Sequence, residues 1–329
     1  MQMEKRKTTY LALAITSKCN YECFYCKKGG ESISCNNETI AFSDLKKVIK
    51  NAVKEGIKNF RITGGEPTTV CYFEDLLEFI MKFENTKVRI TTNGFKLIKY
   101  IEVLSKYRER IGIIISVDSV SKHLGNIYFP KYLSEKVITI TKALKERGID
   151  VRYNIVVTQF NKSEVELLVL KAIKELHVNV KLLDLNKFSN YLGYDGEING
   201  EEALKMWEKL FVPMSEFQTF LESISDKESF NWTTGFVGKT QGIPMNSYFC
   251  NDNWIQVKDS TKGARYSQYC FSNCANCSNC QEGVFSLFLS ANLMLSFSGC
   301  KNDSIHFDLN GCDDLEIQKS IRKLLNLMN

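Results

Sequence analysis

Short apolar runs alternate with amphipathic stretches along the first half of the chain. The apolar runs predict buried strands at Tyr10–Ile15, Asn59–Ile62, Val88–Thr91, Ile111–Val117, Val151–Val157 and Val178–Leu183. Helical spacing between them predicts helices at Phe42–Glu55, Phe73–Phe83, Leu97–Tyr107, Tyr132–Arg147 and Glu164–Leu176. Strands that alternate with helices build a parallel sheet from right-handed βαβ units. Because a closed barrel usually has eight such units, six predict an α/β fold with a partial barrel or a doubly wound sheet.

The regular alternation stops after Asp184. A polar connector at 186–200 precedes a predicted helix at Glu201–Phe211, and the chain is irregular and rich in cysteine from Phe230 onward. A last amphipathic helix is predicted at Asp314–Leu327. We therefore expect two domains, residues 1–185 and residues 186–329.

Composition narrows the function classes. The net charge of +5 is spread along the chain, with no basic patch interleaved with aromatics, so nucleic acid is not expected as a partner. No apolar run approaches the ~20 residues that span a bilayer. The apolar run at the N-terminus is too short for a signal peptide and leads into a cysteine motif. The sequence predicts a cytoplasmic protein without a membrane span.

Twelve cysteines in a cytoplasmic chain call for a reason other than disulfides, which are rare in reducing compartments. The only three histidines, His123, His177 and His306, are far apart and share no motif. The sequence therefore favours metal sites made of cysteine alone, and iron–sulfur clusters prefer thiolates.

Cys19, Cys23 and Cys26 form a C-x3-C-x2-C motif directly after the first predicted strand. Parallel α/β folds place their chemistry at this end of the strands. Three thiolates on a four-iron cluster leave one iron open for a ligand, as a catalytic site requires. The alternative is a structural zinc site completed by a further cysteine such as Cys35.

Polar motifs follow the next four strands. They are Gly64-Gly65-Glu66-Pro67, then Thr92-Asn93, then Ser116 with Asp118, and finally Asn154 within the fifth strand. The glycines permit close approach of the backbone, and the oxygens can accept hydrogen bonds. Each motif alone could be a turn, but together at one end of the sheet they predict a ligand site.

This combination resembles the radical S-adenosylmethionine (SAM) superfamily. The resemblance implies that a [4Fe–4S] cluster on the three cysteines reductively cleaves SAM to a 5′-deoxyadenosyl radical. It places Tyr25 near the adenine and the Gly-Gly-Glu segment at the methionine amino group, with Ser116 and Asp118 near the ribose or carboxylate. It also implies a flavodoxin or ferredoxin as electron donor.

Within the superfamily, the chain is similar to the GTP 3′,8-cyclase family of molybdenum-cofactor synthesis. The similar segments are Ile15–Cys26, Val151–Glu164 and a C-terminal cysteine cluster. The resemblance implies a C-terminal twitch/SPASM-type domain, in which Cys277, Cys280 and Cys300, with Cys274 as a fourth ligand, hold an auxiliary [4Fe–4S] cluster. A zinc knuckle, or a second auxiliary cluster on the remaining cysteines, is the alternative.

Departures from that family bear on the substrate. Its basic Asn-Arg-x-Arg run is replaced here by Gln281–Phe285, and its Gly-Gly tail by Leu327-Met328-Asn329. A triphosphate needs several basic contacts, so GTP is not expected. With only about nine residues before the first strand, a leader-peptide recognition domain is not expected either, which favours a small-molecule substrate in a specialised biosynthetic pathway. Asp184 and Lys187 are candidates to contact it.

Three alternatives stay open from the sequence. They are a maturase of ribosomal peptides, a GTP 3′,8-cyclase-like activity, and a non-catalytic iron–sulfur electron carrier. The last predicts no binding of SAM.

Overall fold

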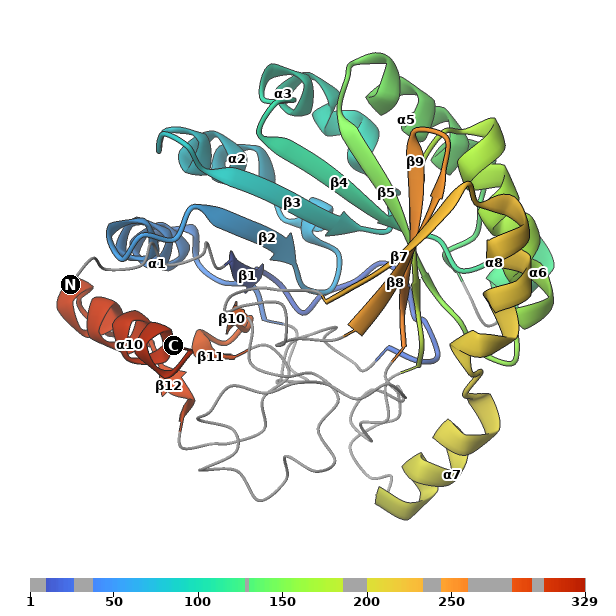
Figure 1. The fold of residues 1–329 in the computed structure, drawn as a ribbon. Helices are drawn as coiled ribbons and strands as arrows, with labels where there is room; N and C mark the ends of the chain where they lie inside the picture. Colours follow the sequence, from blue (N-terminus) through green and yellow to red (C-terminus); the bar gives the residue numbers. More distant parts are fainter. Residues whose placement is uncertain are drawn as a thin grey trace, which may run out of the picture.

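The fold is that of a computed structural model, which describes residues 10–26, 38–127, 130–185, 200–232, 244–259, 286–297 and 305–328. Six parallel strands follow one another in both sequence and space (Figure 1). They are β1 (Tyr10–Ala14), β2 (Asn59–Thr63), β3 (Lys87–Thr92), β4 (Ile111–Ser116), β5 (Asp150–Val156) and β6 (Asn179–Leu183). The α/β class and the parallel sheet are thus confirmed.

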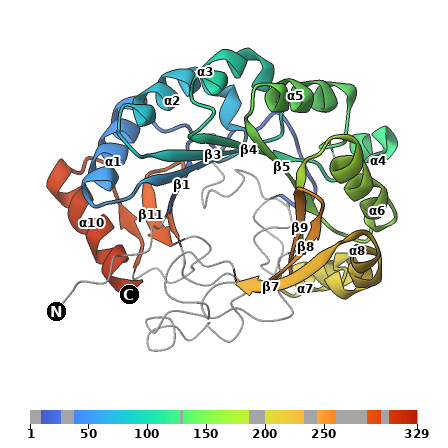
Figure 2. The same ribbon diagram turned by 45° about the horizontal axis from the view of Figure 1, so that its top comes forward.

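The connections between these strands are helical. They comprise α1 (Phe42–Lys54), η1 (Pro67–Thr69), α2 (Phe73–Met81), η2 (Leu97–Tyr100), α3 (Ile101–Lys106), α4 (Lys122–Ile127), α5 (Glu135–Glu146), α6 (Lys162–Leu170) and η3 (Lys171–Glu175). Figure 2 shows the sheet curving into an arc with the helices along its outer, convex side.

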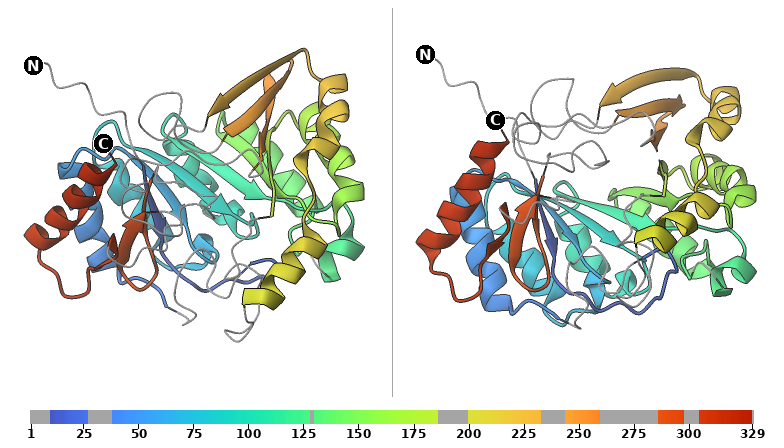
Figure 3. Two further views of the ribbon diagram at one scale, coloured as in Figure 1. Left: turned by 60° about the horizontal axis from the view of Figure 1, so that its bottom comes forward. Right: turned by 90° about the horizontal axis from the view of Figure 1, so that it is seen from below.

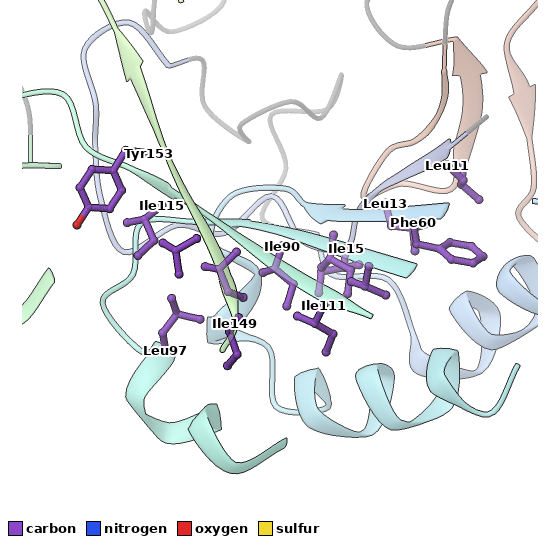
Figure 4. Packing of buried hydrophobic residues seen from close by; sticks show 14 of the residues in the cluster. Leu11, Leu13, Ile15, Phe60, Ile90, Leu97, Ile111, Ile115, Ile149 and Tyr153 are labelled. Atoms are coloured by element: carbon purple, nitrogen blue, oxygen red, sulfur yellow. The ribbon is translucent and has the colours of Figure 1, made fainter. Parts of the chain in front are cut away.

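Alternation along the strands separates a helix-covered face from an inner face. Leu11 and Leu13 of β1 belong with Phe60 of β2 to one buried core beneath the helices (Figure 4). The intervening residues of β1, Ala12 and Ala14, belong to a separate small cluster with Phe288. A single-residue shift in register would exchange the two faces, so this pattern fixes the strand pairing.

Strands from the second half of the chain extend the same sheet at both edges (Figure 3). Beyond β6 lie β9 (Asn253–Lys258), β8 (Pro244–Cys250) and β7 (Lys227–Trp232); beyond β1 lie β10 (Leu287–Leu289), β11 (Met294–Phe297) and β12 (Phe307–Asp308). The expectation of irregular structure after Phe230 was wrong for these segments. They pair mostly antiparallel. The strands β10 to β12 are only two to four residues long, and Asn and Ser residues interrupt the apolar alternation of β7 and β8.

The described residues of the second half include three α-helices, α7 (Gly200–Leu210), α8 (Gln218–Ile224) and α10 (Asp314–Leu327), and the 3-10 turn η5 (Met214–Phe217) before α8. A capping box between Asp313 and Glu316 begins α10, which then packs along α1. Arg322 of α10 makes a two-pronged ion pair with Glu55 at the end of α1, with a shortest distance of 2.7 Å.

The sequence predicted most helices but not their breaks. The helix expected at Leu97–Tyr107 is a 3-10 turn followed by α3, and the one expected at Glu164–Leu176 ends in a π-helical turn. The short helices α4 and α8 were missed. In the described residues, no helix is long and apolar enough to cross a membrane.

Candidate active site

The predicted cysteine motif lies on the loop that leaves β1. Cys19 is exposed, Cys26 is half-buried and Cys23 is buried. The backbone N–H of Cys26 donates to the carbonyl of Cys23 at 2.9 Å, and that of Tyr21 donates to the sulfur of Cys19 at 3.4 Å. Burial raises the pKa of Cys19, and that of Cys23 to about 11. Both thiols therefore need a metal or a cation before they become thiolates near neutral pH.

The Gly-Gly-Glu segment after β2 braces this loop through its backbone. The N–H of Gly65 donates to the carbonyl of Thr16 at 2.7 Å, and the N–H of Glu66 to the carbonyl of Lys18 at 2.8 Å. A Cβ at Gly65 would lie 2.1 Å from the oxygen of Lys18, and one at Gly64 would lie 2.3 Å from that of Thr16. Only glycine fits here, and Gly64 also has φ +136°.

The Glu66 side chain is a buried acceptor for the ends of β2 and β3. One carboxylate oxygen accepts from the backbone and hydroxyl of Thr68 and from the hydroxyl of Thr92 at 2.6 Å. The other accepts from the N–H of Asn93 at 2.7 Å. Glu66 therefore joins the turn beginning at Pro67 to the end of β3 and keeps both in place beside the cysteine loop.

Asn93 connects this network back to the cysteines. Its side-chain amide donates to the Asn20 side chain at 2.9 Å, directly after Cys19. Four of the predicted residues, namely Gly65, Glu66, Thr92 and Asn93, thus form one continuous network with the loop. Their common contribution in this structure is to fix the loop's position.

A second group surrounds Tyr25. The buried Tyr25 hydroxyl donates to one carboxylate oxygen of Asp118, and the other accepts from the N–H of Val156 in β5 at 2.8 Å. Burial raises the pKa values of both Tyr25 and Asp118. The predicted Asp118 therefore orients Tyr25 and attaches β4 to β5.

Lys131 is a half-buried cation beside the cysteine loop that the motifs did not indicate. Its ammonium donates to the Tyr25 hydroxyl at 3.3 Å and lies 5.4 Å from the centre of the Tyr25 ring. Burial alone would lower its pKa, but the negative charges of Cys23, Asp118 and Cys26 outweigh burial and raise it. The same ammonium favours the thiolate form of Cys19 and Cys23. It lies in an irregular segment between α4 and α5, where no spacing rule marks it.

The donor set fits an iron–sulfur cluster. Three cysteines share one short loop, and a cation compensates their charge. In the described part of the chain, no three acidic, cysteine or histidine side chains are grouped to hold a single metal ion. Each thiolate of a cluster binds a different iron, so the three need not converge on one point. The three thiols on one short loop therefore suit the ligands of an iron–sulfur cluster.

The two remaining predicted residues lie on neighbouring strands. Ser116 at the end of β4 pairs in register with Asn154 of β5, on the inner face of the sheet. The side-chain oxygen of Asn154 is buried and has no hydrogen-bond partner among the described residues. A buried acceptor without a partner is costly, and the role of Asn154 in binding a ligand stays a prediction.

Two residues of the Val151–Glu164 segment form hydrogen bonds to the loop that follows β4. Asn161 donates to the backbone carbonyls of Asp118 and Val156, at 2.6 and 2.9 Å. The Glu164 carboxylate accepts hydrogen bonds from the Ser119 hydroxyl and from the backbone N–H groups of Val120 and Ser121. Both hold the loop that follows β4.

Of the remaining predicted residues, one is described by the structure and the others are not. Asp184 is buried directly after β6. Lys187, Cys35 and the proposed auxiliary-cluster ligands Cys274, Cys277, Cys280 and Cys300 lie outside the described residues. The auxiliary cluster stays a prediction, as does the division at residue 185.

A sequence profile of the radical SAM superfamily matches residues 13–201, more than half of the chain. The chain belongs to the radical SAM superfamily. It is therefore an enzyme, and membership implies a [4Fe–4S] cluster and SAM. The match includes the three cysteines and every strand-end motif described above.

Several curated proteins with similar sequences are named GTP 3′,8-cyclase. The GTP 3′,8-cyclase of Clostridium perfringens (strain SM101 / Type A) is 29% identical over 260 residues, covering 77% of this chain and 78% of the relative. That of Aliarcobacter butzleri (strain RM4018) is 31% identical over 205 residues, covering 60% and 61%. This radical SAM enzyme is thus related to the GTP 3′,8-cyclases.

Solved structures support the fold. Streptococcus suis SuiB bound to S-adenosylmethionine superposes with a TM-score of 0.59 at 14% identity, covering 89% of this chain and 60% of SuiB. Native anSMEcpe with bound AdoMet gives a TM-score of 0.54 at 15% identity, covering 97% and 83%. This radical SAM enzyme thus spans about three-fifths of the length of SuiB.

The close approach at Gly65 gives a first prediction. Gly65→Ala places a methyl group against the Lys18 carbonyl, which cannot move without displacing the cysteine loop. We expect anaerobically reconstituted Gly65→Ala to retain little iron at this site, as measured by iron content and by electron paramagnetic resonance (EPR) of the reduced protein. Gly148→Ala is the control, because its φ of +72° adds strain but the nearest atom to the added Cβ is in the Arg108 side chain, at an ordinary contact distance of 3.7 Å. Equal iron in both variants would contradict the bracing role.

Lys131 gives a second prediction. Lys131→Met removes a positive charge beside the thiolates, which disfavours the more negative, reduced cluster. A charge-assisted interaction is worth roughly 1.5–3 kcal/mol, and 59 mV corresponds to about 1.4 kcal/mol for one electron. We expect a midpoint potential lower by roughly 60–130 mV on these scales, measured by EPR-monitored titration. Lys131→Arg should stay near the parent value, and an unchanged potential in Lys131→Met would contradict the assignment.

Proposed function

We propose that this chain reductively cleaves SAM and uses the resulting 5′-deoxyadenosyl radical to abstract hydrogen from an anionic small molecule held on the inner face of the sheet. When bound, the cluster on Cys19, Cys23 and Cys26 supplies the electron for this cleavage and an open iron for the amino and carboxylate groups of SAM. The six parallel strands that carry this face are best described as a partial six-unit barrel.

The chain's own residues arrange the reactants. The Gly-Gly-Glu network fixes the cysteine loop, and Asp118 fixes the Tyr25 ring beside it. Tyr25 and Phe24 pack edge to face at 5.4 Å, and Phe24 packs on Phe160 at 5.3 Å. Together they form an apolar wall around Cys23, which excludes water where a radical has to be protected.

The inner face of the sheet carries a row of cations. They include Arg61 of β2, Arg89 of β3, Arg152 of β5, Lys181 of β6 and Lys258 of β9. Asp150 compensates Arg89 through an ion pair. Such a face attracts phosphate or carboxylate groups, which basic side chains bind with charge-assisted hydrogen bonds.

The substrate proposal rests mainly on the buried guanidinium of Arg152. Burial and the charges of Arg61 and Arg89 lower its pKa to about 10. Its Nε is buried and has no hydrogen-bond partner among the described residues; its guanidinium lies 5.9 Å from the Trp254 ring. Asn154, two residues further along β5, has an orphaned oxygen on the same face. A buried cation crowded by cations and a nearby acceptor together suit a substrate that bears both an anionic group and a hydroxyl or amine.

A GTP 3′,8-cyclase-like activity is the second candidate. The Clostridium perfringens relative that carries that name matches 77% of this chain, and the row of cations could bind a triphosphate. The basic run expected near Cys280 is absent from the sequence, so any binding of a triphosphate would depend on the inner face. The peptide alternative rests on the fold alone, through SuiB in a complex with its precursor peptide SuiA.

The test compares candidate substrates by the SAM cleavage that they stimulate. Reconstituted enzyme, SAM and titanium(III) citrate are incubated with GTP, with a set of phosphorylated and carboxylated small molecules, and with unmodified peptides, and 5′-deoxyadenosine is quantified. We expect an anionic small molecule to stimulate cleavage and GTP to do so less. Stimulation by a peptide alone would overturn the substrate class, and stimulation by GTP alone would establish the second candidate.

A further inference from the structure

We propose that Phe95, Ile98 and the lysines around them form the docking face for an acidic protein that carries a low-potential one-electron centre. This rests on the proposed function, because SAM cleavage consumes one electron. The donor is oxidised by one electron as the cluster is reduced by one, and no proton or atom is transferred with it. The evidence is an exposed apolar patch directly beside the cysteine loop.

The patch contains two large apolar side chains that are exposed and close together in the sequence. Phe95 is 43% exposed in the turn after β3, and Ile98, three residues later at the start of η2, is 49% exposed. Among the described residues, the other large apolar side chains with comparable exposure, Leu167, Leu204 and Leu315, lie on three different helices. Single exposed apolar residues are common on protein surfaces, whereas two that lie close together are more typical of an interface.

The patch is joined to the cluster ligands by short contacts. The Phe95 ring packs edge to face on the Tyr21 ring at 6.1 Å, and the Tyr21 N–H donates to the Cys19 sulfur at 3.4 Å. The N–H of Phe95 donates to Asn93 at 3.0 Å, and Asn93 holds Asn20 of the loop. An electron arriving at Phe95 is therefore separated from an exposed cluster ligand by one aromatic residue.

Charge indicates the kind of partner. The Lys136 ammonium lies 3.6 Å from the centre of the Phe95 ring, and Lys96 and Lys99 flank Ile98. The segment 95–99 contains no acidic residue, although Glu22 and Glu135 lie next to Tyr21 and Lys136 in the sequence. An apolar centre with a basic rim fits an acidic protein, whose approach the lysines would steer.

The test measures reduction of the cluster by two donors. Reduced flavodoxin serves as the acidic protein donor and titanium(III) citrate as the chemical one, in parent, Phe95→Ser, Lys99→Glu and Lys136→Glu enzymes. We expect each variant to lower the second-order rate with flavodoxin by about tenfold at low salt, with a smaller difference at high salt. Deoxyadenosine formation with titanium(III) citrate should stay at the parent level. Leu315→Ser and Lys319→Glu, on α10, are the matched controls, with an exposed leucine and an exposed lysine.

Three outcomes would overturn the docking face. Test variants that match the α10 controls with flavodoxin would show that this face is not used. Equal losses with both donors would place these residues in the SAM site. A parent dimer that Phe95→Ser dissociates would assign the patch to a second copy of the chain. Failure of the proposed function has a separate signature, since the parent would then form no deoxyadenosine with titanium(III) citrate.

Discussion

Cys23→Ala is expected to lose about four irons per chain and to reduce deoxyadenosine formation to background. Cys23 is the buried member of the three cysteines, and its thiolate is stabilised by the Lys131 ammonium. Without it the cluster has two protein ligands and a cavity in an apolar wall. Iron content, the EPR spectrum of the reduced protein and deoxyadenosine yield together measure the effect.

Cys250→Ala is the matched control for this prediction. Cys250 is also a buried thiol, but it lies at the end of β8 and its sulfur donates to the carbonyl of Ile224 at 3.0 Å. The control should keep the parent's iron and activity. Equal iron loss in both variants would contradict the assignment, because it would reflect general destabilisation of the core.

Arg152→Gln is expected to lower kcat/KM for an anionic substrate by roughly 10- to 150-fold, as the loss of a buried charge-assisted interaction of about 1.5–3 kcal/mol implies. The change keeps the side chain polar and removes its charge from the crowded inner face. SAM binding should be unaffected, because Arg152 has no described contact with the cysteine loop. The readouts are substrate-dependent deoxyadenosine formation and, separately, SAM affinity.

Arg147→Gln is the control for Arg152. Arg147 lies on the outer side, at the end of α5, and its side-chain contacts with the described residues are a 4.0 Å ion pair with Glu102 and a hydrogen bond to its own helix. If Arg152→Gln and Arg147→Gln had the same kcat/KM, the row of cations would have no part in substrate binding. If Arg152→Gln lost SAM affinity as well, its role would lie in the cofactor site.

The sequence predicted the sheet well for a physical reason. Strands β1 and β4 are buried along almost their whole length, so runs such as Ile111–Ser116 are almost continuously apolar and stand out from the helices between them, while β3, β5 and β6 show the alternation of a strand with one buried face. Among strands β7 to β12, which extend the sheet at its two edges, the pairings with one another are antiparallel, and β10 to β12 are only two to four residues long. Their pattern is too weak to read without knowing the partner strand.

The site was predicted as a set of residues, but their roles were less accessible. Cysteine spacing and glycines at strand ends identify positions locally, and the comparisons support the family they indicate. That Glu66 and Asp118 hold other residues of the site in place follows only from contacts between strands. Lys131 and Arg152 were missed because their significance depends on burial and on charges from several strands, which no local motif encodes.

The most direct test of the account is deoxyadenosine formation by the parent enzyme. The protein is reconstituted without oxygen, its iron is counted, and SAM and titanium(III) citrate are added with and without the substrate panel. The account predicts SAM binding by the iron-loaded protein and 5′-deoxyadenosine that increases with the correct substrate. An iron-loaded protein that neither binds nor cleaves SAM under any of these conditions would contradict it.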